Sequence, residues 1–362
     1  MSTRREFIKN AVAVAGFSFC GCPLIDAARA QQPGQRGLPV SVNGKRVMTI
    51  DVHAHCQFHE TVALMNGVTA FGANIKGAQQ TFISVGERLQ AMDAMAVDME
   101  VLSINPFWYG ADRDLAAQIV KIQNEKLAEL CASRPRRFAA FASLALQSPD
   151  LAVQQLEFAV KKLGLRGAAI GGSAAGAEFS EAKFNPVWAK VEELGVALFL
   201  HPQGTPELAK RFTGNGWLAN TIGNPPETTI ALQHLIFEGT LERFPGLKII
   251  AAHGGGYLPS YAARSDHACF VSPLDCNPTI KLKKKPSEYL NQLYFDALVF
   301  TPEALRHLVA QVGASQVMLG SDHPYPWEDR PVDAILATDS LSDDQKIAIL
   351  GGNAAALLGI KA

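Results

Sequence analysis

Apolar residues along the chain follow two alternating patterns. Short runs rich in Val, Ile, Leu and Phe end at polar or turn-forming residues, which is typical of buried strands. They predict eight strands, at residues 47–52, 100–104, 138–144, 167–170, 196–200, 248–252, 293–295 and 317–319. Longer segments with helical periodicity lie between and after them, at residues 84–95, 114–133, 149–163, 185–194, 226–237, 257–267, 302–312 and 332–338. Strands that alternate with helices in this way predict an α/β fold, a single (β/α)8 TIM barrel over residues 47–362.

Turn-forming residues support these boundaries. Pro149 and Pro302 stand at the first positions of predicted helices, where no backbone N–H is needed, and Gly164 and Gly195 close two others. The stretch from 203 to 224 contains four glycines. It predicts a long irregular excursion after the fifth strand, of the kind that forms a lid or substrate loop at a barrel mouth.

The first 30 residues have the features of an export signal. Arg4 and Arg5 precede an apolar stretch at 11–20, and Ala28 and Ala30 supply the small residues of a cleavage site. The segment resembles a twin-arginine signal, which predicts a periplasmic or secreted protein without stable membrane insertion after cleavage. Residues 31–46, which begin rich in Gln, Gly and Pro, are predicted to form a linker.

Composition is that of an ordinary soluble protein, with 48% hydrophobic residues and a formal net charge of -1. This charge creates no long-range field toward nucleic acid or an anionic membrane, so neither is an expected partner. Of six cysteines, Cys20 and Cys22 leave with the signal, and the other four show no CxxC spacing. The cysteines therefore predict neither a disulfide framework nor sulfur-ligated zinc, and Cys56 is expected to be a buried free thiol.

Imidazole and carboxylate groups recur where the predicted strands end. They are His53 and His55 after the first strand, His201 after the fifth, His253 after the sixth and Asp322 after the eighth. Side chains at i and i+2 share one face of a strand, so His53 and His55 can bind one ion together. Singly, each residue has an ordinary reading as a hydrogen-bonded core residue. Together, at strand ends that converge in a barrel, they predict one site for a divalent metal such as zinc.

His253 is followed by three glycines at 254–256. No Lys or Ser/Thr follows at the spacing of a phosphate-binding loop, so a loop that lets substrate approach His253 is favoured. His323, next to Asp322, could support the metal ligands by hydrogen bonding. The other histidines of the predicted domain are expected to be structural or superficial: His59, His234, His267 and His307.

Short strings along the chain match, in order, the motifs of a known family. They include IDVHAH at 50–55, LHP at 200–202, PETTIA at 226–231, AHGGG at 252–256 and LGSDHP at 319–324, with others at 88–93, 134–138, 244–248 and 294–297. On these motifs the chain resembles the amidohydrolase-related family (amidohydrolase 2). Because His53 stands where another branch has Glu, it is similar to the branch of aminocarboxymuconate semialdehyde decarboxylase.

The resemblance implies a TIM barrel of the metal-dependent hydrolase type that holds one divalent ion, with Zn²⁺ favoured and Mn²⁺ as the alternative. The implied metal ligands are His53, His55, His201 and Asp322. His253 is implied to stand beside the ion as the catalytic acid/base. A homodimer is also implied, because the family's counterpart of Arg264 reaches a substrate carboxylate partly across a dimer interface. The alternative for Arg264 is a salt bridge with Asp266.

Several positions depart from the family pattern. Lys76 stands near the first substrate-binding arginine, and Arg264 matches one of a later arginine pair, whose second member is replaced at 271–272. Gln203 replaces an aromatic residue after His201-Pro202. The metal site is therefore retained while the residues that bind substrate carboxylates are altered, which leaves the substrate open.

Three functions are compatible with these residues. The favoured one is a metal-dependent, non-oxidative decarboxylase (carboxy-lyase) of a small unsaturated or aromatic carboxylic acid, in which His253 delivers a proton to the substrate carbon. The second is a hydrolase of a lactone, amide or ester on the same site, with Asp322 as a catalytic proton shuttle. A metal-binding or scaffold protein without turnover is disfavoured, because the ligand set is complete and His253 stands beside it.

Overall fold

The computed structural model describes residues 39–65, 84–276 and 278–361. The predicted export signal, most of the predicted linker and Lys76 lie outside these ranges. All eight predicted strands are present: β3 (Ile50–His55), β4 (Met99–Ser103), β5 (Phe138–Ala140), β6 (Gly167–Ile170), β9 (Ala197–Leu200), β10 (Lys248–Ala251), β11 (Leu293–Asp296) and β12 (Val317–Met318).

These strands form a closed parallel barrel. Hydrogen bonds join them in two groups, β3-β4-β5 and β6-β9-β10-β11-β12. Parallel bridges from Ala142 to Ala168 and from Ala54 to His323 connect the two groups at both seams. The predicted TIM barrel is therefore confirmed, and its strand carboxyl ends converge on one mouth.

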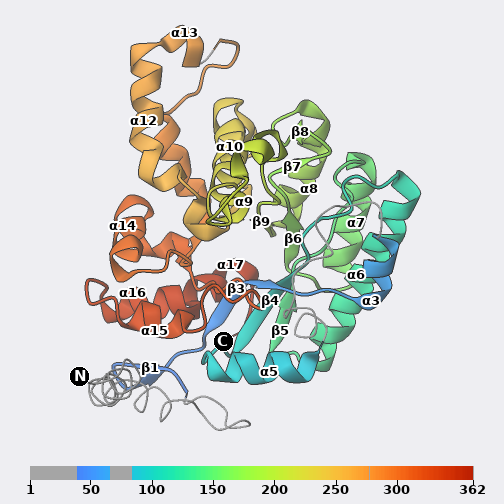
Figure 1. Cartoon of the computed structure of the whole chain (residues 1–362), viewed down its shortest axis with the longest axis vertical. Coiled ribbons are helices and arrows are strands. Elements are labelled where there is room, and N and C mark those ends of the chain that lie inside the picture. Colours follow the sequence, from blue (N-terminus) through green and yellow to red (C-terminus); the bar gives the residue numbers. More distant parts are fainter. Residues whose placement is uncertain (1–38, 66–83, 277, 362) are drawn as a thin grey trace, which may run out of the picture.

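Helices surround the strands (Figure 1). The eight predicted ones are α5 (Val85–Ala94), α6 (Arg113–Ser133), α7 (Pro149–Lys161), α8 (Asn185–Leu194), α10 (Asn224–Phe237), α12 (Leu258–Val271), α14 (Pro302–Val312) and α15 (Pro331–Leu336). The pattern did not predict α3 (His59–Leu64), α16 (Asp343–Ile347) or α17 (Asn353–Leu358). The helix α12 and the single turn α13 (Pro273–Cys276) project away from the barrel at the top of Figure 1.

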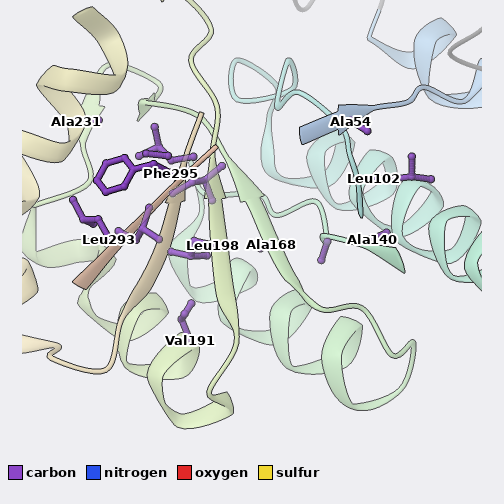
Figure 2. Close-up of a cluster of buried hydrophobic side chains, with 14 of the residues drawn as sticks. Ala54, Leu102, Ala140, Ala168, Val191, Leu198, Ala231, Leu293 and Phe295 are labelled. Atoms are coloured by element: carbon purple, nitrogen blue, oxygen red, sulfur yellow. The ribbon is translucent and has the colours of Figure 1, made fainter. Parts of the chain in front are cut away.

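Two apolar cores hold these layers. The inner one contains residues such as Val52, Phe199 and Met318 from the strands, and Ala354 and Leu358 of α17 pack into the same core. The outer one packs the strands against the helices. Figure 2 shows part of the outer core, with Ala168 of β6 paired in register with Leu198 of β9 and with Val191 on the neighbouring α8.

A register shift in β3 aims its histidines. Ile50 and Val52 face the inner core, whereas Ala54 belongs to the outer core, and the pairing of β3 with β4 shifts between Asp51 and Ala54. Such irregularities re-aim side chains next to active sites. The strand also ends three residues later than predicted, so His53 and His55 lie inside it and both point to the barrel mouth.

Two expectations need correction or refinement. Cys269 on α12 and Cys276 on α13 form a disulfide, although their spacing predicted none, while Cys56 is a buried free thiol as expected.

The described end of the predicted linker forms a β-hairpin of Ser41–Val42 and Lys45–Arg46 around an Asn-Gly turn, a sequence that favours this turn. Within the described ranges, no helix has the length and apolarity to cross a bilayer.

Candidate metal centre

The five predicted metal-site and catalytic side chains meet at the barrel mouth. His53 and His55 come from β3, and His201, His253 and Asp322 follow β9, β10 and β12. Ligand atoms of His53, His201, His253 and Asp322 all lie within 4.8 Å of one another. This group contains His253 and not His55. The sequence predicted the opposite, with His55 as a ligand and His253 beside the ion. The interatomic distances of the two residues are therefore compared next.

The distances fit ligands of a single ion. His53 Nε2 lies 3.1 Å from Asp322 Oδ1, and His55 Nε2 lies 2.8 Å from the same oxygen. The two Nε2 atoms of His53 and His55 are 3.2 Å apart. Two ligand atoms about 2.1 Å from one ion at a tetrahedral angle are roughly 3.4 Å apart. By this measure His55 is as well placed as His53, while His201 Nε2 and His253 Nε2 are 3.9 Å and 3.7 Å from Asp322 oxygens.

Unusual backbone conformations hold two of these residues. His253 has φ of 55° and Asp322 has φ of 66°, a left-handed region that side chains other than glycine seldom adopt. Gly320 permits the close packing beneath them, since a Cβ there would lie 2.7 Å from the Cβ of Asp296 and 3.1 Å from that of His53. Strain of this kind persists where the surroundings over-determine it, often at functional sites.

Burial makes the electrostatics of the cluster unusual. Burial disfavours a charged His53, but the carboxylates of Asp322 and Asp296 outweigh it and raise the pKa of His53 to about 10. Burial lowers the pKa of His55 to about 4 and that of His201 well below its usual range. Burial also opposes ionisation of Asp322, yet the neighbouring His53, His253 and His55 hold its pKa well below the usual range. The cluster therefore combines neutral imidazoles, one carboxylate and one held positive charge.

Several polar atoms of the cluster have no partner among the described residues. Both ring nitrogens of His201 and Nδ1 of His253 are buried without a hydrogen bond. Leaving such groups unsatisfied costs about 1–3 kcal/mol each. A divalent cation fits this set, because imidazole nitrogens and a carboxylate are its preferred ligands, and it would give the unpaired Nε2 of His201 a partner.

Asp296, at the end of β11, supports the cluster and was not singled out from the sequence. Its Oδ2 accepts from Nδ1 of His53 at 2.6 Å and from the backbone N–H of His253 at 2.9 Å, and its Oδ1 accepts from that of Gly254 at 2.9 Å. Asp296 therefore fixes the tautomer that leaves His53 Nε2 free for an ion, and it also positions the His253 turn. The available signal was its place at a strand end, like the other site residues.

A buried ionic network supports His55 from the opposite side. Ser103 Oγ lies 3.0 Å from Nδ1 of His55, and Arg88 donates to the His55 carbonyl. Glu100 accepts from Arg88 Nη1 and lies against His323 Nδ1, both at 2.6 Å. Burial opposes ionisation of Glu100, but Arg88 and His323 keep its pKa below the usual range. His323 thus acts through this network, and the sequence did not reveal Glu100 as its partner.

The substrate-binding predictions have different outcomes. Arg264 is exposed on α12, away from the cluster, and Asp266 instead accepts hydrogen bonds from Ser287 at 2.9 Å and 2.6 Å. Among the described residues Arg264 has no ion pair, so the alternative of a salt bridge with Asp266 is wrong. Gln203 lies on the loop after β9, which Glu227 holds by accepting from the backbone N–H groups of Gln203 and Gly204.

Comparison with known proteins places this site in a family. The sequence matches the amidohydrolase family over residues 50–360. The chain belongs to this family. It is 33% identical over 279 residues to 2-amino-3-carboxymuconate-6-semialdehyde decarboxylase from Dictyostelium discoideum, covering 75% of this chain and 76% of that one.

Solved structures agree. The structure of 5-carboxyvanillate decarboxylase from Sphingomonas paucimobilis matches with a TM-score of 0.81 at 28% identity, covering 87% of this chain and 100% of that one. A dihydroxybenzoic acid decarboxylase from Polaromonas sp. with bound manganese matches with a TM-score of 0.74 at 28% identity, covering 87% and 98%. The predicted family, fold and activity, a metal-dependent non-oxidative carboxy-lyase, are confirmed by these likenesses.

The support that Asp296 gives to His53 can be tested directly. Asp296→Asn should weaken metal binding by about 10–100-fold, because the amide cannot hold the Nδ1–H of His53 as a carboxylate does. Chelator competition measures the affinity. Asp98→Asn is the matched control, since Asp98 is a partly buried carboxylate that accepts from the backbone N–H of Thr49 at 3.0 Å, near the amino end of β3. Unchanged affinity in Asp296→Asn would contradict this role.

Proposed function

We propose that this chain binds one divalent ion, Zn²⁺ or Mn²⁺, through His53, His55, His201 and Asp322, and that it removes the carboxyl group of a small unsaturated or aromatic acid at this centre. The observation that carries the proposal is the convergence of the imidazole Nε2 atoms of His53, His55 and His201 on the buried carboxylate of Asp322, at 3.1, 2.8 and 3.9 Å from its Oδ1. The three relatives described above are named as decarboxylases, which supports the reaction class.

The ion, when bound, would supply the Lewis acidity that holds the substrate oxygens and stabilises negative charge. His253 is the group best placed to move a proton. Its side chain is 17% exposed, whereas that of His55 is 1% exposed, so His253 is the imidazole that a substrate entering the mouth meets. The bond between the substrate carbon and its carboxylate breaks and carbon dioxide leaves. The electron pair stays on that carbon and takes a proton from His253.

Asp322 has two roles in this proposal. Oδ1 faces His53 and His55, where an ion would lie, and Oδ2 lies 3.7 Å from Nε2 of His253. The carboxylate can therefore bind the ion and stabilise the protonated His253 between turnovers. Both residues have a left-handed backbone, which helps to aim their side chains at one another.

A substrate screen tests the reaction class. Protein loaded with zinc or with manganese should release carbon dioxide from at least one acid in a panel that includes 5-carboxyvanillate and dihydroxybenzoates, the acids named for its structural relatives. His201→Ala should bind less metal and release none. Hydrolysis of lactones, amides or esters with no carbon dioxide from any acid would favour the hydrolase alternative.

The roles of His253 and His55 can be separated by matched variants. His253→Asn should keep its metal and lose about 10²–10⁴-fold in kcat, the usual contribution of a general acid/base. His55→Asn should lose metal. Elemental analysis and carbon dioxide release measure both. Loss of metal from His253→Asn with retention in His55→Asn would reverse the assignment. The ligand atoms of the alternative set, His53, His201, His253 and Asp322, lie within 4.8 Å of one another.

We also propose that the protein is a homodimer that pairs through α12. Tyr257, Tyr261 and Arg264 are spaced i, i+4 and i+7, so they share one helix face, and Tyr261 is 57% exposed. Phe270 near the end of α12 and Leu274 on α13 are also exposed, on the elements that project from the barrel in Figure 1. Such a surface marks an interaction site, and a second copy would also bring Arg264 to the partner's site.

Arg264→Ala should raise KM for the acidic substrate by roughly 10–100-fold, the loss expected for a hydrogen-bonded charge pair, with bound metal and unfolding temperature unchanged. Arg306→Ala is the control, because Arg306 is a half-exposed arginine that pairs with Glu303 on α14. An unchanged KM in Arg264→Ala would contradict the role in substrate binding.

Mixing His253→Asn with Arg264→Ala, at a substrate concentration well below the raised KM of the arginine variant, shows whether Arg264 acts across the dimer. In a mixed dimer of His253→Asn and Arg264→Ala, one site has both its own His253 and the partner chain's arginine. Random mixing should then restore about a quarter of wild-type activity. No recovery after confirmed subunit exchange would place the action of Arg264 within its own chain.

A further inference from the structure

Three aromatic side chains from separate loops meet on the mouth side of the barrel. Trp217 and Trp327 stack with ring centroids 5.3 Å apart and planes 14° apart, and the Phe300 ring lies 6.2 Å from that of Trp327. Trp217 follows β9, Phe300 follows β11 and Trp327 follows β12. We refer to Trp217, Phe300 and Trp327 as the aromatic ledge.

The ledge reaches across the rim instead of joining neighbouring loops. In the barrel, β10 and β11 separate β9 from β12. The stack of Trp217 on Trp327 therefore spans the loops of four consecutive strands. In the excursion that carries Trp217, no residue of the 3-10 helix η2 (Pro206–Phe212) or of α9 (Leu218–Thr221) is buried. The stack thus joins this largely exposed excursion to the loop after β12.

The ledge adjoins the metal centre. The ring of Tyr325 lies 5.5 Å from that of His55, and the backbone N–H of Trp327 donates to the Tyr325 carbonyl at 2.9 Å. On the other side, Phe300 follows Val299, which packs against Gly254 next to His253. The loop that carries Trp327 therefore also contacts the cluster through Tyr325.

Folding alone does not account for the ledge. Trp217 is 61% exposed and Phe300 is 54% exposed, so most of each ring remains in water. Both also have a left-handed backbone, with φ of 50° and 66°. Bulky residues in this region are genuine outliers, and residues held there cluster at ligand-binding sites. Exposed apolar area and backbone strain are both unfavourable, and a planar apolar ligand that covers the rings would offset them.

We propose that the aromatic ledge binds a planar apolar group of the substrate that lies beyond the ring carrying the departing carboxylate. This deepens the proposed function and rests on it. The preferred substrates are then acids with a second ring or an extended conjugated group, in place of single-ring acids. Trp217, Phe300 and Trp327 determine this specificity by stacking, and they take no part in the proton transfer.

The tryptophans offer a binding readout that needs no turnover. The chain has four, and Trp108 and Trp188 are buried, with their indole N–H groups bonded to the carbonyls of Leu144 and Phe179. Fluorescence that acrylamide can quench therefore comes from Trp217 and Trp327. A ligand on the ledge should shield this fluorescence.

The test compares benzoate with biphenyl-3-carboxylate on the zinc-loaded protein. Biphenyl-3-carboxylate should bind about tenfold more tightly, the change that about 1.4 kcal/mol produces, and should reduce acrylamide quenching. Trp217→Ala and Phe300→Ala should each shrink the preference to less than about threefold. Phe158→Ala is the matched control, since Phe158 is 52% exposed on the distant α7, and it should keep the wild-type preference.

Equal affinities of the wild-type protein for the two acids would overturn the proposal. So would a preference that survives both ledge variants, which would leave the stack as a contact that only holds the loop. Circular dichroism and metal content show that each variant is folded. Decarboxylation of single-ring acids without a two-ring preference would refute the ledge and keep the proposed function. The reverse result would keep the ledge as a binding site and refute the decarboxylase.

Discussion

The structure depends on how the charges of one buried cluster of imidazoles and a carboxylate are compensated. Four histidine rings and Asp322 share a site in which His53, His55 and Asp322 are 5% exposed or less. Burial lowers the pKa of His55 and His201, so both rings are neutral, while Asp322 and Asp296 favour a positive charge on His53, whose pKa is raised to about 10. A divalent ion bound among these groups, as proposed above, would compensate the carboxylate and would displace a proton from His53.

The barrel supplies this site through backbone geometry. The register shift in β3 turns the side chains of His53 and His55 toward the mouth. The left-handed turns at His253 and Asp322 bring residues from β10 and β12 to the same point. Asp296 of β11 joins the first and sixth strand ends by binding His53 and the backbone of His253. Arg88 and Glu100 anchor the carbonyl of His55 and the ring of His323. Chemistry at the mouth therefore depends on strands from most of the barrel.

Most of the fold and the clustering of the site residues were predictable from the sequence, for identifiable reasons. The strands are apolar runs and the helices are periodic, so tertiary packing agrees with local preference. His53, His55, His201, His253 and Asp322 share a position relative to strand ends, and a barrel brings such positions together. The first strand was placed three residues early, because a bulged strand has no clean alternation to mark its end.

The remainder depends on contacts that a linear pattern does not contain. Asp296 is a single carboxylate at a strand end, and only the approach of His53 from 243 positions away reveals its role. Glu100 and His323 meet in the same way across the closed seam of the barrel. The Cys269–Cys276 disulfide depends on how α13 folds back on α12. The exposure of Arg264 follows from the projection of α12, which no periodicity in that helix indicates.

Proton release on metal binding tests the central claim most directly. Titration of zinc into the metal-free protein at about pH 6, where a zinc-bound water with a pKa of about 7 would mostly keep its proton, in two buffers of different ionisation enthalpy, measures both stoichiometry and protons displaced. At that pH His53 alone among the proposed ligands should be an imidazolium, with protons on both ring nitrogens, whereas the others are neutral imidazoles or a carboxylate. We therefore predict one ion bound per chain with release of about one proton. No saturable binding, or binding that releases no proton and persists in His53→Ala, would contradict the account.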